Sequence, residues 1–413
     1  MTELHREPPL APAGLRAIPS GVWALGFVSL FMDVSSETIH AALPLFLTTS
    51  LGASMVAVGW IEGLAEATAS LTRVFAGTLS DLLGRRKPLL LLGYGLAAAT
   101  KPIFALAGSV EAVLAARCLD RVGKGLRGAP RDALVADLTP PELRGAAFGL
   151  RQALDTVGAF LGPLLAAGLL AATAHAFRRV FWIAVAPALV SVAILAAAVR
   201  EHEPARPAGP PRVPLRASEL RRLGAPFVWI LAGATLLTTA RFSEAFLILR
   251  AESVGVPLAA SPLVLVAMNL TYSGVAYPMG RLSDRIDRRR LLVAGSAVLA
   301  LADGVLAFAG GPASLLAGVL LWGLHMGMTQ GLFAALVADA APPALRGTAF
   351  GLFHLSSGAA LLGASVLAGE LWAHLGPAAT FLAGAGMIVL ALAVLGGATW
   401  HVRRRSATTP RRG

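Results

Sequence analysis

Charged residues and cysteine are scarce in this sequence. Only 14% of its 413 residues are Asp, Glu, Lys or Arg and 56% are hydrophobic, whereas about 25% of the residues of soluble proteins are charged. These proportions exclude an ordinary soluble protein and indicate an integral membrane protein. The single cysteine, Cys118, excludes an intramolecular disulfide bond.

Motifs for catalysis and metal binding are also missing. The sequence has no His-Glu-x-x-His, no Gly-x-Ser-x-Gly and no Gly-x-x-x-x-Gly-Lys, and its eight histidines lack metal-ligand spacing. We therefore expect no enzyme, no cofactor and no metal ion, and an ion gradient rather than ATP as the energy source. A sensor or receptor built on a transporter body is the alternative, and a soluble signalling domain would favour it.

Apolar runs long enough to cross about 30 Å of hydrocarbon as helices occur in two groups of six. They begin near residues 22, 55, 88, 111, 145 and 178, and near 226, 257, 291, 312, 346 and 377. This predicts an all-α membrane protein of twelve transmembrane helices in two six-helix bundles. We expect bundles over 22–199 and 225–399, a linker over 200–224 with many prolines and arginines, and tails over 1–21 and 400–413.

The net charge of +12 has a topological cause rather than a nucleic-acid partner. Most arginines lie in short segments between apolar runs, which is typical of cytoplasmic loops. Arg178 and Arg179 are exceptions on the expected outer side. The polar, proline-rich first 21 residues do not resemble a cleavable signal peptide. We expect a multi-pass protein of a prokaryotic inner membrane with both termini in the cytoplasm.

Two blocks of sequence recur in the two halves. Residues 133–150 and 335–352 are identical at fourteen of eighteen positions, at an offset of 202. Gly77 to Leu90 recurs as Gly280 to Val293 at an offset of 203. Two blocks at nearly one offset predict a duplicated six-helix half. In the first pair, Asp137 and Asp339 are expected to cap or pair within the turn that follows them.

The second pair of blocks resembles the loop signature of the major facilitator superfamily, in which a glycine permits close helix packing, an aspartate follows it and a basic cluster marks the cytosol. Leu82 stands where a basic residue is common, and Asp287 where glycine is common. The resemblance extends through the twelve runs and the linker. The matching residues are Gly77, Asp81, Gly84, Arg85, Arg86 and Lys87 in the first half and Gly280, Asp284, Arg288 and Arg289 in the second.

The fifth apolar run adds a second resemblance. Its glycines and proline are similar to the signature of the proton-coupled antiporters of this superfamily, the drug exporters especially. Ala166 and Ala167 stand where that signature closes with two glycines, although small residues still permit close helix contact. A glycine-rich helix that only packs tightly is the alternative. The matching residues are Gly149, Gly158, Gly162 and Pro163.

The resemblance implies a substrate cavity between the halves, lined by the first and fourth span of each half. In the first span, Asp33, Ser36, Glu37 and His40 share one helix face within about 100°. Carboxyl groups in an apolar setting bind protons more readily than in water. Asp33 and Glu37 are therefore the candidates for proton coupling, and ion pairing with an arginine of the fourth span is the rival interpretation. Glu62 and Glu66 of the second span are weaker candidates.

The fourth span carries a cationic stripe within about 120° of one helix face. Arg117 resembles an arginine that is linked to proton transfer in the antiporters, and we assign coupling to Arg117 and Arg121. The second half has no such stripe at the 202 offset, so coupling and charge recognition are expected in the first half. The stripe consists of Arg117, Arg121, Lys124, Arg127 and Arg131.

Together these features predict a proton-coupled antiporter that exports a small organic compound by alternating access. Its partners would be that compound, protons and the lipid bilayer, and we expect a monomer. The alternative is an importer or exchanger of an organic anion, such as a carboxylate or phosphate ester, held by Arg117, Arg121 and Lys124. The candidate substrate-binding residues are His40, Lys124, Arg127, Arg151, Arg241, Glu244, Trp322 and His325.

Overall fold

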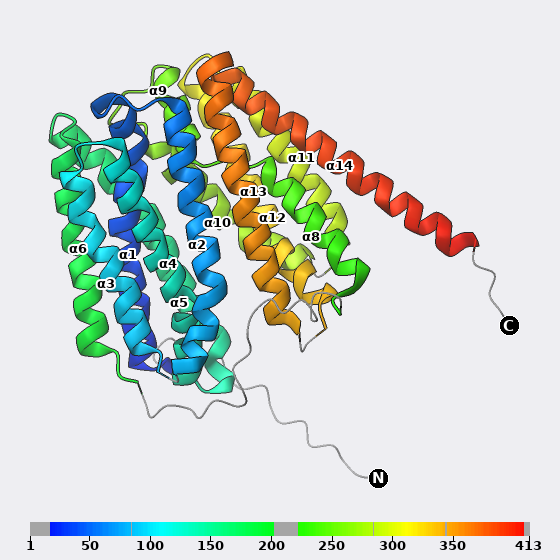
Figure 1. Cartoon of the computed structure of the whole chain (residues 1–413), viewed down its shortest axis with the longest axis horizontal. Coiled ribbons are helices and arrows are strands. Elements are labelled where there is room, and N and C mark those ends of the chain that lie inside the picture. Colours follow the sequence, from blue (N-terminus) through cyan, green and yellow to red (C-terminus); the bar gives the residue numbers. More distant parts are fainter. Residues whose placement is uncertain (1–16, 84, 202–221, 284, 343–344, 409–413) are drawn as a thin grey trace, which may run out of the picture.

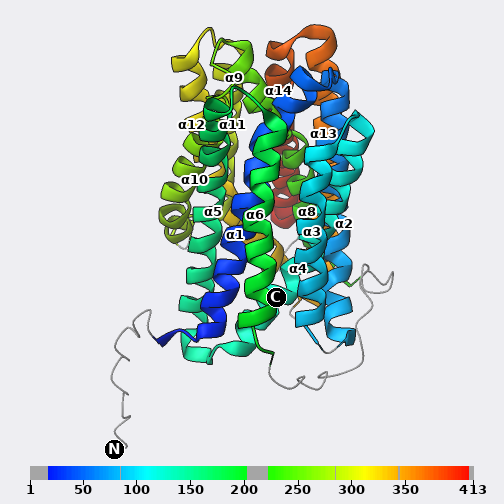
Figure 2. The same ribbon diagram turned by 90° about the vertical axis from the view of Figure 1, so that its left-hand side faces the viewer.

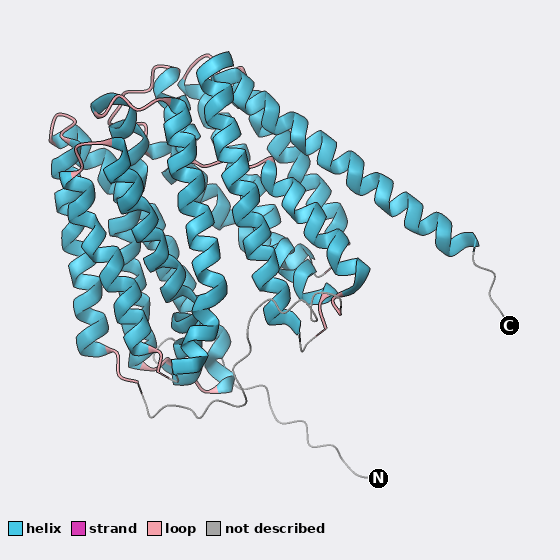
Figure 3. Ribbon diagram, in the orientation of Figure 1, coloured by secondary structure: helices cyan, strands magenta, loops and turns pink. Residues whose placement is uncertain are grey.

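A computed structural model describes residues 17–83, 85–201, 222–283, 285–342 and 345–408 of the chain. All regular structure in these residues is helical (Figure 3). Seven helical segments among them are long and apolar enough to cross a membrane. The segments of α2 and α4 do not meet that composition because they carry the charged residues described below.

The first half consists of six long helices. Ser109 begins the fourth of them, because its side chain accepts a hydrogen bond from the backbone amide of Ala112 at 3.3 Å. In Figure 2, α6 lies in front of α1 and beside α3, and it packs against both. The helices are α1 Ser20–Leu45, α2 Met55–Leu83, α3 Lys87–Leu106, α4 Val110–Leu138, α5 Arg144–Ala172 and α6 Phe177–Ala198.

The second half follows the same plan, and α10 begins at Leu263 rather than near residue 257. Turns occupy that interval, in which Pro257 and Pro262 disfavour a regular helix. The helices are α8 Gly224–Thr239, α9 Ala245–Ser253, α10 Leu263–Ser283, α11 Arg288–Ala307, α12 Pro312–Ala340, α13 Arg346–Leu375 and α14 Pro377–Thr408.

The seventh span is broken, and the prediction of a continuous helix there is wrong. α8 ends at Thr239 and α9 begins at Ala245. Ser243 stabilises the break, since its hydroxyl accepts a hydrogen bond from the Ala245 amide at 3.2 Å and its own amide donates to the Ser365 hydroxyl at 3.2 Å. Arg241 and Glu244 lie in this break.

The two halves are in close contact at one end, which we call the sealed end; it holds α9 and the π-helix Phe46–Ser50 that follows α1. Here α2 meets α13 through glycines. A Cβ added to Gly59 would lie 2.4 Å from the Ser365 carbonyl oxygen, and one added to Gly369 would lie 2.5 Å from that of Met55. One buried apolar cluster includes side chains from both halves, such as Leu47 and Phe246. The sealed end is therefore closed by backbone contact and by an apolar plug.

At the opposite end, which we call the open end, α2 and α13 diverge (Figure 1). The close packing that the sequence predicts at the two signature glycines is not found there. A Cβ on Gly77 would approach Ala129 only to 3.8 Å, and one on Gly280 would meet nothing within 4 Å. The fold thus leaves access to its interior from the open end alone.

Candidate substrate and coupling site

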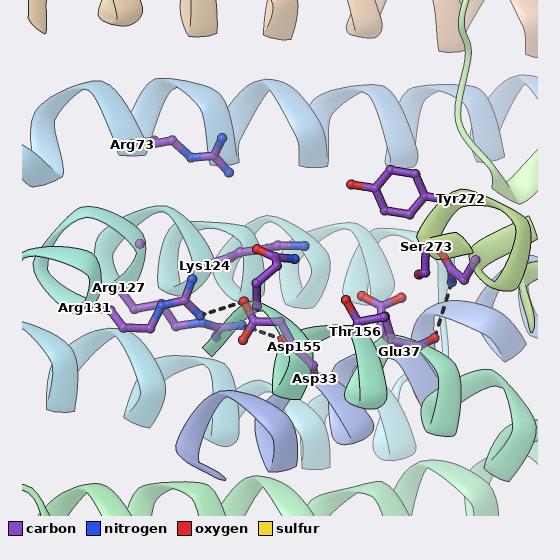
Figure 4. A pocket seen from close by; sticks show the side chains of 14 residues that line it. Asp33, Glu37, Arg73, Lys124, Arg127, Arg131, Asp155, Thr156, Tyr272 and Ser273 are labelled. Carbon is purple, nitrogen blue, oxygen red and sulfur yellow. Dashed lines mark hydrogen bonds and ion pairs between the residues drawn. The ribbon is translucent and has the colours of Figure 1, made fainter. Parts of the chain in front are cut away.

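A cavity of about 290 Å³ lies between the two halves. Helices α1, α2, α4 and α5 supply its charged lining, and α10 supplies Asn269, Tyr272 and Ser273. The first half thus supplies all the charged lining residues, and the second half supplies only uncharged hydrogen-bonding groups. The charged lining residues are Asp33, Glu37, Arg73, Lys124, Arg127, Arg131 and Asp155 (Figure 4).

Two cations of the fourth helix are paired within the cavity. Arg127 places Nη2 3.8 Å from Oδ1 of Asp33, and its guanidinium lies 4.8 Å from the centre of the Tyr94 ring. Arg131 lies 3.5 Å from Asp155 and donates a hydrogen bond to the Ser29 hydroxyl at 2.8 Å. The rival interpretation of Asp33, an ion pair with an arginine of the fourth span, therefore matches its geometry.

Two other cations of the lining have no hydrogen bond or ion pair with any described residue: Lys124 of α4 and Arg73 of α2. The lining contains four cations and three carboxylates, a formal balance of +1. Glu37 is also engaged, since its Oε2 lies 3.3 Å from Nδ1 of His40. The cavity therefore presents uncompensated positive charge to whatever enters it.

The sealed-end part of the stripe does not line the cavity. Arg117 is buried and donates a hydrogen bond to Oε2 of Glu62 at 3.1 Å, while Arg121 is buried 3.6 Å from Glu66. Two carboxylates four residues apart on α2 thus match two arginines four residues apart on α4. These pairs could have been predicted from that matched spacing in the sequence.

Further pairs neutralise the same region. Lys101 of α3 lies 2.7 Å from Asp120 and donates to the Ser36 hydroxyl at 2.9 Å. Nε2 of His40 lies 3.6 Å from Glu62. Buried charges persist in proteins only when they are paired. The sealed-end part of the stripe forms two ion-pair groups, which together we call the ion-pair network. One contains Arg117, Glu62 and His40, and the other contains Arg121, Glu66, Asp120 and Lys101.

Glu62 also joins this network to the second half. The hydroxyl of Ser243, in the break between α8 and α9, donates to Oε2 of Glu62 at 3.2 Å. Oε1 of Glu62 is buried and has no hydrogen-bond partner among the described residues. The break therefore contacts the network directly, next to the sealed end.

The glycines of the fifth helix lie directly behind the carboxylates of the first. A Cβ added to Gly158 would come within 2.8 Å of Cβ of Asp33, and one added to Gly162 within 2.5 Å of Cβ of Glu37. The Thr38 hydroxyl also donates to the Gly162 carbonyl oxygen at 3.1 Å. These glycines thus set the position of the carboxylate face of α1. Pro163 is buried beside them.

We expect Gly162→Ala to lower the free energy of unfolding by about 1–3 kcal/mol, the usual cost of overpacking, because Glu37 and its backbone cannot move away from the new methyl group. Thermal unfolding in mild detergent measures this. Gly149→Ala is the matched control, since its Cβ would meet nothing within 4 Å. Equal stability of the two variants would show that the contact with α1 is unimportant.

The other predicted substrate residues lie outside the cavity. Arg151 pairs with Asp155 at 2.9 Å, as its i, i+4 spacing predicts. Trp322 is buried against Phe242, with ring centroids 5.3 Å apart. Nδ1 of His325 donates to the Gly295 carbonyl oxygen at 2.8 Å, a hydrogen bond that joins α12 to α11. Contact of Trp322 or His325 with a substrate would require a different conformation of the second half.

The duplicated loop blocks form equivalent ion pairs at the open end. Arg86 binds Asp137, with Nε 2.6 Å from Oδ2, and Arg288 binds Asp339. Both partners differ by 202 residues, so Arg86 rather than the exposed Arg85 is the counterpart of Arg288. The prediction that these aspartates cap or pair within their own turn is wrong.

Two aspartates of the loop signature are not placed by these contacts. Asp284 lies outside the described residues, as does the side chain of Asp81. Among the described residues, no group of three or more His, Cys, Asp or Glu side chains could hold a metal ion.

Comparisons with known proteins agree with this architecture. An uncharacterized MFS-type transporter of Methanocaldococcus jannaschii is 31% identical over 387 residues, which cover 91% of this chain and 94% of that protein. The multidrug resistance protein MdtH of Photorhabdus laumondii is 28% identical over 363 residues, 86% of each chain. A crystal structure of a mutant nucleoside transporter NupG superposes with a TM-score of 0.77 at 13% identity, covering 91% of this chain and 99% of the other.

The model of one family matches nearly the whole chain, over residues 25–251 and 242–412. The first match covers the first half and continues through the linker to α9, and the second match covers the rest of the second half. Each half has its own open-end ion pair. This confirms the fold predicted from the loop signature and from the duplicated blocks. The chain belongs to the major facilitator superfamily of membrane transporters.

Proposed function

We propose that this transporter exports a small organic compound from the cytoplasm in exchange for protons. The observation that carries the proposal is the position of Asp33 and Glu37, two partly exposed carboxylates in a cavity between the halves that is closed at one end. Antiport requires that the proton and the compound compete for one site. A carboxylate that binds either of them meets this requirement.

Three further features support export by antiport. The glycines of α5 hold the carboxylate face of α1, and they match the antiporter signature. MdtH, a relative that covers most of the chain, is named a multidrug resistance protein. The basic loops at the open end favour placing that end in the cytoplasm, with the protein in a prokaryotic inner membrane. Both termini would then be cytoplasmic, and we expect a monomer.

A second candidate is the import or exchange of an organic anion. Lys124 and Arg73, which form no ion pair with a carboxylate among the described residues, favour it, because cations that line a cavity attract a carboxylate or phosphate. Protonation of Asp33 would release Arg127 and strengthen anion binding. An anion would therefore bind together with a proton, whereas a cationic or neutral export substrate would bind instead of one.

Proton flux in proteoliposomes distinguishes the two candidates. Internal pH is recorded under an imposed pH gradient while cationic, neutral and anionic compounds are added. If the proposal holds, cationic or neutral compounds release protons through the wild type, and Asp33→Asn abolishes the release. Glu370→Gln, whose side chain on α13 is 45% exposed and lies outside the cavity, is the control. Proton movement driven only by anions would contradict export by antiport and support the second candidate.

A further inference from the structure

Asp303 of α11 is a buried carboxyl group with no partner. Its exposed fraction is 0%, and neither of its oxygens has a hydrogen-bond partner among the described residues. It also forms no ion pair there, unlike the buried carboxylates of the first half. The cavity and its ion-pair network do not include it.

A gap created by Gly384 of α14 brings a second acceptor to the same place. A Cβ added to Gly384 would lie 2.6 Å from Oδ2 of Asp303 and 3.3 Å from the carbonyl oxygen of Ala240. Ala240 caps the C-terminal end of α8, where helical carbonyl oxygens lose their intrahelical donors. Two oxygen acceptors therefore border one gap, and no described residue donates a hydrogen bond to either oxygen of Asp303.

The surroundings of Asp303 offer no compensating charge. The break between α8 and α9 carries Arg241 and Glu244, and α12 carries His325, but none of these forms an ion pair or hydrogen bond with Asp303. His325 is already bonded to the Gly295 carbonyl oxygen. The facing residue of α14 is a glycine. An ionised carboxylate without a partner is very costly in such a setting, so the group must be neutralised.

The position of Asp303 relates it to the sealed end. Phe242, which follows Ala240 in the break, contacts Trp322 and Phe381, each with ring centroids 5.3 Å apart. All three rings belong to the buried cluster that joins the two halves at that end. When the halves separate there, this aromatic layer loses its cover and solvent can approach the gap beside Gly384.

We propose that Asp303 is a proton-binding site of the second half, and that the sealed end closes only over a neutral Asp303. A proton taken from solvent in the outward-open state would form the carboxyl O–H, which would donate to the Ala240 carbonyl oxygen. The same proton returns to solvent when the sealed end reopens. This site is separate from Asp33 and Glu37 and does not depend on the cavity being a substrate site.

Infrared difference spectroscopy of the purified protein tests the protonation. At mildly alkaline pH, the wild type should show the C=O stretching band of a neutral carboxylic acid, and Asp303→Asn and Asp303→Ala should lack it. Asp33→Asn should retain it. The absence of the band in the wild type would overturn the proposal whether or not the variants fold. So would its persistence in Asp303→Asn or its loss in Asp33→Asn.

A distance measurement tests the link to closure. Spin labels are attached at Ser50, the last residue of the π-helix, and at Pro257 between α9 and α10, two exposed positions at the sealed end, after Cys118 is replaced by serine. Raising the pH should shift the wild type toward longer label distances, while Asp303→Asn should keep the short distance at every pH. A wild-type distance that is independent of pH, or a variant that opens like the wild type, would overturn the coupling of Asp303 to closure.

Discussion

Replacing Arg117 by alanine is expected to lower the free energy of unfolding by about 3–5 kcal/mol, the usual result of breaking a buried ion pair from one side. Arg117 and Glu62 are both buried, and their hydrogen bond is 3.1 Å long. In the variant, Glu62 keeps its contacts with His40 and Ser243 but loses the guanidinium group that balances its charge. Titration of the unfolding in mixed detergent measures the loss.

The pair can be separated from general damage by a second variant. Adding Glu62→Gln to Arg117→Ala removes the orphaned charge and should recover a large part of the lost stability. Arg290→Ala, at an exposed position near the start of α11 at the open end, should stay within about 0.5 kcal/mol of the wild type. An Arg117→Ala variant as stable as Arg290→Ala would contradict the ion-pair network.

Replacing Lys124 by glutamine is expected to weaken the binding of anionic compounds by about ten- to a hundredfold, which corresponds to about 1.5–3 kcal/mol for a hydrogen bond to a charged group. Lys124 lines the cavity and has no hydrogen bond or ion pair with any described residue. Its removal therefore frees no buried carboxylate, and stability should change little. Equilibrium binding of a panel of anions in detergent measures the effect.

The outcome bears on substrate class. Arg290→Gln is the matched control, because it removes one positive charge from an exposed position at the start of α11 without touching the cavity. If Lys124→Gln and Arg290→Gln bind anions equally well, the unpaired cations of the cavity do not recognise substrate. The second candidate function would then lose the observation that favours it.

The repeated blocks were sufficient to predict the fold, because duplication, helix length and loop charge are all local properties of the sequence. The break in the seventh span was not predicted. It contains neither glycine nor proline, and it is stabilised by Ser365 and Glu62, which are far away in the sequence. The late start of α10 at Leu263 could be inferred from Pro257 and Pro262, since both are local signals.

The site was predicted in part for a related reason. Helical spacing placed Asp33, Glu37, Lys124 and Arg127 on inward faces, and all four line the cavity. Spacing on one helix does not identify the partner on another. The assignment of Arg117 to Glu62 depends on how α2 and α4 pack. The same limit explains why Asp137 was expected to pair within its own turn, although its partner is Arg86 in another loop.

The central claim is alternating access around the cavity, and thiol labelling tests it most directly. In a variant with Cys118 replaced by serine, Ser273→Cys places one thiol in the cavity lining. A membrane-impermeant thiol reagent is applied to sealed vesicles of known orientation, with and without a pH gradient. We predict labelling from the cytoplasmic face at rest and increased labelling from the outer face when the gradient drives the cycle. Labelling from the outer face at rest, or accessibility that the gradient does not change, would contradict the account.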